Sequence, residues 1–209
     1  MTCWSSKGGS GTTVVAAALA TLLAAEGGSA VLADLAGDQP AALGLPEPDH
    51  GLTGWRDGDD LGALELATGP GLALLARGAG DLPLGLGPAL AGHLARRAAV
   101  VDAGVIGGGG GPGGAAAVEL ALGATASLLV LRPCFLALRR AVVAPLRPSG
   151  VVLVDEADRV LGPSDVEAAL GVPVVAVVPW DPAVARRVDA GLLGSSLPRG
   201  LARALRGAA

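Results

Sequence analysis

The sequence predicts a single α/β domain, built as a mostly parallel, twisted sheet with helices on both faces. Short apolar runs rich in β-branched residues recur along the chain, and Ala/Leu-rich stretches of helical length alternate with them. The apolar runs are continuous rather than interrupted by alternating polar residues, as expected for strands that are buried on both faces. The length of 209 residues suits one domain, residues 1–209.

The first half of the chain supplies three of the expected strands, at Thr2–Ser5, Ala30–Asp34 and Gly71–Ala76. A Gly-rich loop follows the first strand, and a helix over Thr13–Glu26 follows that loop and ends at two glycines. The second strand ends on a carboxylate. Leu35–Trp55 is expected to be mostly loop, because Gly and Pro punctuate it.

The second half supplies four further strands, at Ala99–Asp102, Ser127–Leu131, Val151–Val154 and Val174–Val178. The expected helices are Leu90–Ala98, Leu136–Val143, Ser164–Leu170, Pro182–Ala190 and Leu197–Leu205. The strand that begins at Ala99 again ends on an aspartate. Gly107–Gly114 is a low-complexity run that we interpret as a flexible loop.

Composition narrows the class of protein. The hydrophobic fraction of 51% and the mean hydropathy of +0.57 would by themselves permit a membrane protein. The longest uncharged stretches, Gly8–Ala25 and Ala168–Trp180, are broken by Gly, Ser, Thr or Pro, whereas a spanning helix needs roughly 20 apolar residues. We therefore expect no spanning helix and a cytoplasmic protein, with peripheral attachment to a membrane or to the nucleoid as the alternative. The net charge of -4 argues against extensive binding to nucleic-acid phosphates.

The strongest local signal lies between the first strand and the first helix, where the chain reads Ser6-Lys7-Gly8-Gly9-Ser10-Gly11-Thr12-Thr13. A Gly-rich loop at such a junction lets backbone N–H groups surround phosphate oxygens, and the helix N-terminus adds partial positive charge. Thr13 can place its hydroxyl on Mg²⁺. The standard phosphate loop has Lys where this chain has Thr12, so a tight turn without a ligand is the alternative.

Lys7 is the only lysine among 15 basic residues; all the others are arginine. A single lysine in an arginine-rich chain indicates a position where the larger, planar guanidinium is a poor substitute. Chance is the alternative explanation for one residue.

The loop resembles the deviant Walker A motif, K-G-G-x-G-K-[ST]-T, of the ParA/MinD family of ATPases. Lys7 matches the signature lysine of that family, and Gly8, Gly9, Gly11 and Thr13 match in register. The resemblance implies a P-loop NTPase fold that binds ATP or ADP with Mg²⁺ and forms a homodimer when nucleotide is bound. It also implies that Lys7 contacts the phosphates held by the partner subunit.

Three further segments extend the resemblance over most of the chain. Val31–Leu35 resembles the second strand with its D-x-D segment, Val100–Gly104 resembles Walker B with the start of switch II, and Val178–Asp181 resembles the segment beside the nucleotide base. The resemblance thus implies a set of roles: Gly8, Gly9, Ser10, Gly11 and Thr12 around the phosphates, Thr13 and Asp102 on the Mg²⁺ side, and Pro179 and Asp181 beside the base. The low-complexity run that follows Asp102 could then belong to a nucleotide-sensing switch.

The amino-acid sequence is further similar to actinobacterial members related to the CpaE/TadZ and septum-site-determining branch in three segments: Asp34–Pro48, Arg132–Arg140 and Asp181–Leu193. This similarity implies a protein that positions a chromosome, a septum or pilus machinery, and that binds protein partners of that machinery.

Two departures from the family pattern concern catalysis. Thr12 replaces the loop lysine, and Ala36 stands where the second Asp of D-x-D would position the attacking water; Asp38 lies two residues further on and could replace it. Lys7 and Asp38 are the catalytic candidates. Losing a positioning group typically costs about 10²-fold or more in rate. We therefore expect slow or impaired hydrolysis, with a non-catalytic scaffold that binds partners without a nucleotide switch as the alternative.

Other ligands are less favoured. The chain has no Asn, which excludes the N-K-x-D guanine motif and leaves adenine by elimination. Arg139-Arg140 and Arg186-Arg187 could form a basic face for DNA, but solvated helix faces are the better interpretation at this net charge. The C-terminal leucines are expected to pack on the core rather than to bind a membrane.

Overall fold

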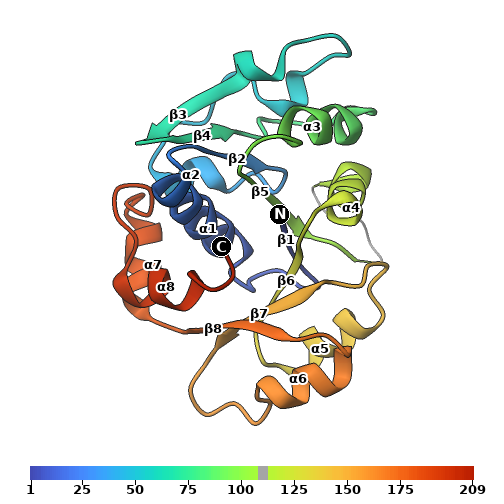
Figure 1. Ribbon diagram of the computed structural model, residues 1–209, viewed down its shortest axis with the longest axis vertical. Helices are drawn as coiled ribbons and strands as arrows, with labels where there is room; N and C mark the ends of the chain where they lie inside the picture. Colours follow the sequence, from blue (N-terminus) through green and yellow to red (C-terminus); the bar gives the residue numbers. More distant parts are fainter. Residues whose placement is uncertain (108–112) are drawn as a thin grey trace.

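The computed structural model describes residues 1–107 and 113–209, and within them the predicted α/β fold is confirmed (Figure 1). Eight strands form one sheet in the order β3-β4-β2-β5-β1-β6-β7-β8. All neighbouring strands are parallel except β3 and β4, which pair antiparallel at one edge. The strands are β1 Thr2–Ser5, β2 Ala30–Asp34, β3 Glu65–Gly69, β4 Leu72–Leu75, β5 Ala99–Val105, β6 Ser127–Leu131, β7 Gly150–Asp155 and β8 Val174–Pro179.

Helices cover both faces of the sheet (Figure 1). One face carries α1 Thr12–Gly27, α2 Gln39–Leu43, α7 Pro182–Asp189 and α8 Arg199–Leu205. The other face carries α3 Leu86–Leu94, α4 Gly114–Gly123, α5 Phe135–Val142 and α6 Pro163–Leu170. Two short 3₁₀ helices, η1 Leu52–Gly54 and η2 Leu61–Leu64, lie between α2 and β3.

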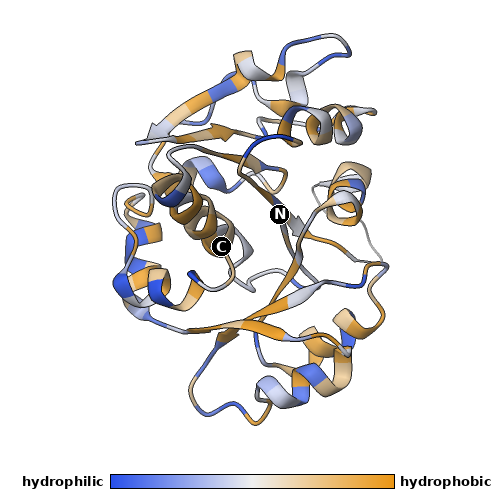
Figure 2. Ribbon diagram, in the orientation of Figure 1, coloured by the Kyte–Doolittle hydropathy of each residue, from blue (hydrophilic) through white to orange (hydrophobic). Residues whose placement is uncertain are grey.

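Each face of the sheet has its own apolar core, because successive strand residues point to opposite faces. In β1, Cys3 packs among the α1 and α8 residues, while its neighbour Trp4 packs on the opposite side among α3, α4 and α5 residues. Both side chains are fully buried. Figure 2 shows the consequence: the strands are mostly hydrophobic, and hydrophilic residues gather on outlying helices and loops.

Several predicted elements need correction. The loop expected over Leu35–Trp55 contains α2, which has proline in its first turn and ends at Gly44 in the left-handed region (φ 73°). The helix expected over Leu90–Ala98 lies at Leu86–Leu94, because Ala95–Ala98 lead into β5. Neither β3 nor α4 was predicted. Of the predicted loop Gly107–Gly114, residues 108–112 lie outside the described residues, and Gly114 begins α4.

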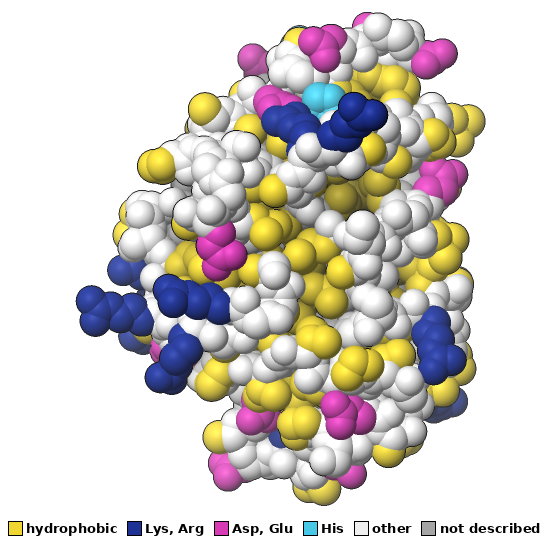
Figure 3. All heavy atoms as spheres, viewed as in Figure 1, with side chains coloured by type: hydrophobic (Ala, Val, Ile, Leu, Met, Phe, Trp, Pro, Cys, Tyr) yellow, Lys and Arg dark blue, Asp and Glu magenta, His cyan; other side chains and the backbone are white. Residues whose placement is uncertain are grey.

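The C-terminal helix packs on the core, as predicted. Leu201 and Leu205 of α8 are buried against α1 and β8. Basic side chains gather over the α7–α8 region in Figure 3, where Arg186, Arg199 and Arg203 are exposed. In the part of the chain that the structure describes, no helix has both the length and the apolar character that crossing a membrane would require.

The turn after α2 and the turn after α7 touch through two glycines. A Cβ added to Gly44 would come within 2.1 Å of the Gly191 carbonyl oxygen, and one added to Gly191 would come within 2.7 Å of the Gly44 Cα. Both residues also have left-handed φ values, 73° and 64°. Side chains are therefore excluded at both positions by space as well as by conformation.

Candidate nucleotide-binding site

The loop between β1 and α1 is shaped by glycine conformation and by hydroxyl contacts. Gly9 and Gly11 adopt φ values of 76° and 90°, which side-chain-bearing residues rarely adopt. The Ser10 hydroxyl donates to the Lys7 carbonyl at 2.7 Å and closes the loop, while the Ser6 hydroxyl donates to the Ala137 carbonyl at 2.8 Å and anchors it to α5. Helix α1 begins without a side-chain cap, so the N–H groups of its first turn are open to an anion.

A cavity of about 280 Å³ opens over this loop. The residues that line it are Ala36, Asp38 and Gly104, among others, together with the loop residues Gly8, Gly9, Ser10, Gly11, Thr12 and Thr13. The structure thus brings the predicted phosphate loop and Asp38 to the same space. A Cβ added to Gly8 or Gly9 would meet no atom within 4 Å, so both positions face open room. The loop has the space and the donors that a phosphate chain requires.

Two aspartates lie at the carboxyl ends of neighbouring strands beside the loop. Asp34 of β2 and Asp102 of β5 are register partners, and neither is accessible to solvent. Asp34 Oδ1 accepts from the backbone N–H groups of Ala36 and Gly37, at 2.9 and 2.7 Å. Asp102 Oδ1 accepts from the N–H of Gly104 at 3.1 Å. These bonds fix the turn that follows each strand, and the Leu35 N–H, which donates to the Asp102 carbonyl at 2.8 Å, joins the end of β2 to β5. Both ends lie at the edge of the sheet where open α/β folds bind ligands.

Gln39 connects these aspartates to α1. Its backbone N–H donates to Asp34 Oδ2 at 3.0 Å, and its side-chain amide donates to Asp102 Oδ2 at 2.9 Å and to the Thr13 carbonyl at 3.0 Å. The Gln39 side chain is fully buried, and its Oε1 atom has no hydrogen-bond partner among the described residues. Sequence reasoning missed this residue.

Burial changes the acidity of both carboxyl groups. Removal from water, together with the nearby Asp102 carboxyl, raises the pKa of Asp34 to about 7, although three backbone N–H groups oppose the change. Burial also raises the pKa of Asp102, and hydrogen bonds from Gln39, Gly104 and Thr13 oppose this rise. A cation near Asp102 would favour the charged form of both carboxyl groups.

The residues predicted to bind Mg²⁺, Thr13 and Asp102, are brought together through Gln39, whose side-chain amide donates to the Thr13 carbonyl and to Asp102 Oδ2. Among the described residues there is no group of three or more His, Cys, Asp or Glu side chains placed to hold a metal ion. Mg²⁺ commonly binds proteins through one or two side chains and takes its other ligands from phosphates and water. The donor set therefore fits a cation that arrives with a phosphate-bearing ligand.

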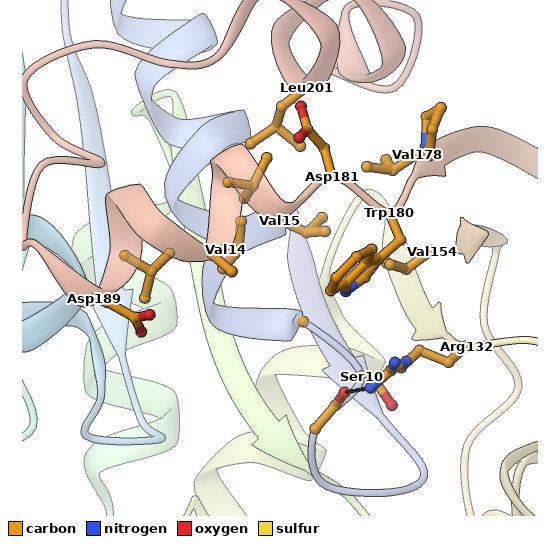
Figure 4. Close-up of a pocket in the computed structure, with 16 residues that line it drawn as sticks. Ser10, Val14, Val15, Arg132, Val154, Val178, Trp180, Asp181, Asp189 and Leu201 are labelled. Atoms are coloured by element: carbon orange, nitrogen blue, oxygen red, sulfur yellow. Dashed lines mark hydrogen bonds between the residues drawn. The ribbon is translucent and has the colours of Figure 1, made fainter. Parts of the chain in front are cut away.

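A second cavity, of about 250 Å³, adjoins the loop at Gly9, Ser10 and Gly11 (Figure 4). Its walls are mainly apolar: Val14 and Val15 from α1, Val154 from β7, Val178 and Pro179 from β8, Val184 and Val188 from α7, and Leu201 from α8. The ring of Trp180 forms part of the wall, and the residue is 53% exposed. An apolar cavity with an aromatic side suits the flat ring of a base.

The remaining predicted residues are placed as follows. Pro179 and Asp181 line the second cavity, where Asp181 also caps α7 by accepting from the Ala183 N–H at 2.7 Å. Lys7 is half-buried and is not among the described residues that line either cavity. Arg132 lines the second cavity although sequence reasoning gave it no role.

The sheet is mostly parallel and has a Gly-rich loop between a strand and a helix, with two strand-end aspartates and an apolar cavity beside that loop. These features define an α/β nucleotide-binding domain of the P-loop class. Residues 1–193 match the model of the CobQ/CobB/MinD/ParA nucleotide binding domain, so the chain belongs to that family. Among curated protein sequences, no match is found.

Solved structures agree on the fold. The Aquifex aeolicus MinC:MinD cell division protein complex matches with a TM-score of 0.77 at 20% identity, covering 99% of this chain and 94% of that one. A ParA family ATPase from Chlorobium tepidum matches with 0.75 at 18% identity, covering 98% and 95%. The septum site-determining protein MinD of Pyrococcus horikoshii, complexed with Mg-ADP, matches with 0.73 at 20% identity, covering 97% and 90%.

Proposed function

We propose that this protein binds an adenine nucleotide with Mg²⁺ and uses its nucleotide state to control homodimerisation, in the manner of ParA/MinD ATPases. The observation that carries the proposal is the cavity over the glycine loop, which is lined by Gly8–Thr13 and Asp38 and shares Gly9, Ser10 and Gly11 with the apolar cavity beside Trp180. This arrangement offers a phosphate cradle and a base site that share one loop. Family membership and the fold support it.

The proposed roles follow from position. The backbone N–H groups of Gly8, Gly9, Ser10, Gly11 and Thr12 bind phosphate oxygens, and Thr13 with Asp102 forms the Mg²⁺ side. Pro179 and Asp181 stand beside the base. Mg²⁺, when bound, neutralises phosphate charge. Asp38 lines the phosphate cavity and is exposed, which suits a group that orients water.

Lys7 is proposed to act on a second subunit. Its side chain makes no hydrogen bond or ion pair with the described residues, and Lys7 is not among the described residues that line either cavity. A cation in this position can reach phosphates bound by the partner when two loops face each other. We further propose that the protein is related to the actinobacterial CpaE/TadZ and septum-site-determining branch, and that it positions a chromosome, a septum or pilus machinery.

The rival function is a non-catalytic scaffold that binds protein partners without a nucleotide switch. Thr12 favours it, because the loop lacks the charge that its family pattern places there, and so does Ala36. The two functions differ in one measurable property, since only the switch requires nucleotide.

The test is thermal unfolding with increasing ATP or ADP, with and without Mg²⁺. A ligand that binds only the folded state adds about 2.7 kcal/mol to the free energy of unfolding at one hundred times its dissociation constant. Trp180 gives a local readout, because Trp4 and Trp55 are buried whereas Trp180 is exposed. Bound nucleotide should protect Trp180 from a fluorescence quencher, and Trp180→Phe should remove that signal. No stabilisation and no saturable signal up to millimolar nucleotide would exclude the switch.

A further inference from the structure

The two cavities are short of positive charge. Among the described residues that line them, Arg132 is the only Lys, Arg or His, whereas Asp38, Asp181 and Asp189 are acidic. Thr12, which stands at the position of the family's loop lysine, is buried and uncharged. The phosphate chain of a nucleotide carries several negative charges, so the proposed function requires a cation that the loop does not supply from its own side chains.

Arg132 reaches the loop from the end of β6. Its Nη1 atom donates to the Gly9 carbonyl at 3.2 Å, across 123 positions of sequence. Figure 4 shows the side chain directed at the loop beside Ser10. The Arg132 side chain is 37% exposed, so its guanidinium is accessible from the cavity. It therefore places a permanent positive charge where the phosphate cradle meets the apolar cavity.

The present partner of Arg132 has a second cation. Glu156, just after β7, pairs with Arg132 Nη2, and it also pairs with Arg159 three residues later. Arg159 lines neither cavity among the described residues. If Arg132 turned from Glu156 to a phosphate, Arg159 would still compensate the Glu156 carboxylate. Breaking an ion pair is usually costly because one charge is left without a partner. This exchange avoids that cost, since Glu156 keeps Arg159.

We infer that Arg132 binds the phosphate chain of the nucleotide and supplies, from the loop after β6, the positive charge that Thr12 does not supply from the glycine loop. The inference rests on the proposed function and adds a phosphate-binding residue to it. The guanidinium has five N–H donors, so it can keep the Gly9 carbonyl and still present a pair of donors to phosphate oxygens. In the absence of phosphate, Glu156 pairs with the Nη2 group of Arg132.

The test compares ligands that differ only in phosphate content. The dissociation constants of adenosine, ADP and ATP are measured by calorimetry for the parent, Arg132→Gln and Arg132→Lys. Loss of a charge-assisted contact is worth about tenfold or more in affinity. Arg132→Gln should weaken ADP and ATP by about that factor and leave adenosine unchanged, and Arg132→Lys should recover part of the loss.

Two further variants separate binding from structure. Glu156→Gln releases Arg132 and should tighten ATP binding. Arg159→Gln removes the cation that compensates Glu156 after the exchange, so this variant should weaken ATP binding and leave adenosine binding unchanged. Equal effects of Arg132→Gln on adenosine and ATP, or no effect on either, would refute the role of Arg132 while the proposed function stands. A parent that binds none of the three ligands would overturn both.

Discussion

Asp34 and Asp102 face each other as register partners at the ends of β2 and β5, and both carboxyl groups are completely removed from solvent. Two carboxylates in such a position repel each other and lose hydration, so the folded protein favours the protonated forms. The amide of Gln39 and several backbone N–H groups offset this only in part. The pair therefore makes stability depend on pH.

The nucleotide-free protein should lose stability as pH rises from about 4 to 7. In this window Asp34 is already ionised in the unfolded chain, whereas its pKa of about 7 keeps it protonated in the folded chain. The folded state therefore binds more protons than the unfolded state, and each unit of pH increase lowers the free energy of unfolding by up to about 1.4 kcal/mol. The stabilising contribution of Asp34 is fully present below pH 3.8 and is lost as the pH rises through 7. Denaturant unfolding across pH 4–8 measures it.

Asp102→Asn checks the cause, because the Asp102 carboxyl contributes to the raised pKa of Asp34. The steep part of the stability curve should move to lower pH in this variant. Asp57→Asn, which changes an exposed carboxylate, is the control and should leave the curve in place. An Asp102→Asn curve that superimposes on the parental one would show that the two groups are not coupled.

Gln39→Leu should destabilise the fold by about 1–3 kcal/mol, because Asp102 Oδ2 and the Thr13 carbonyl lose their donor inside the protein. Gln39→Glu should cost more at neutral pH than at pH 5, since it adds a third acid beside Asp34 and Asp102. Thr21→Val removes a single hydrogen bond within α1 and is the matched control. Chemical denaturation measures all three. Equal stability of Gln39→Leu and the parent would mean that the amide bridge contributes nothing.

Thr12→Lys should tighten ATP binding, because it restores a charge to the loop at the position where the family pattern has lysine. The same charge added by Thr125→Lys, at the opposite edge of the sheet, should not. Parental turnover is expected below the usual enzymatic range of about 1–10³ s⁻¹. Calorimetry and a phosphate-release assay measure the two quantities. If Thr12→Lys binds ATP no better than the parent, missing charge is not the limiting defect.

Lys7→Ala should abolish the ATP-dependent shift from monomer to dimer and leave the nucleotide-free thermal midpoint nearly unchanged, because the lysine side chain makes no hydrogen bond or ion pair with the described part of its own chain. Lys7→Arg should rescue the shift poorly, since the planar head is larger. Analytical ultracentrifugation with a non-hydrolysable ATP analogue measures the assembly state. Dimerisation of Lys7→Ala at the parental nucleotide concentration would exclude the trans contact.

The sequence predicted the central strands well, because their burial on both faces leaves an uninterrupted apolar run. Ala30–Asp34 and Ser127–Leu131 have the predicted bounds. The elements that were missed lack that signature. Helix α2 has only five residues, β3 is a half-exposed edge strand, and α4 begins at a glycine after a Gly-rich run. Local pattern cannot identify elements whose stability comes from contacts with distant parts of the chain.

The same distinction applies to the site. The glycine loop and the strand-end aspartates were predictable, because each belongs to a contiguous motif at a strand terminus. Gln39 and Arg132 were not, because their roles depend on contacts with Asp102 and Gly9, 63 and 123 positions away. Arg132 lies in a segment whose sequence resembles that of family members, yet only the fold shows that its guanidinium reaches the loop.

The backbone contact between Gly44 and Gly191 joins two regions that serve different parts of the site. Gly44 ends the helix that begins with Gln39, and Gly191 follows α7, whose Val184 and Val188 line the apolar cavity. With no side chain between them, neither turn can move closer to the other without backbone overlap. The contact therefore sets how near the end of α2, the helix that places Gln39 on the strand-end aspartates, lies to the end of α7, the helix that lines the apolar cavity.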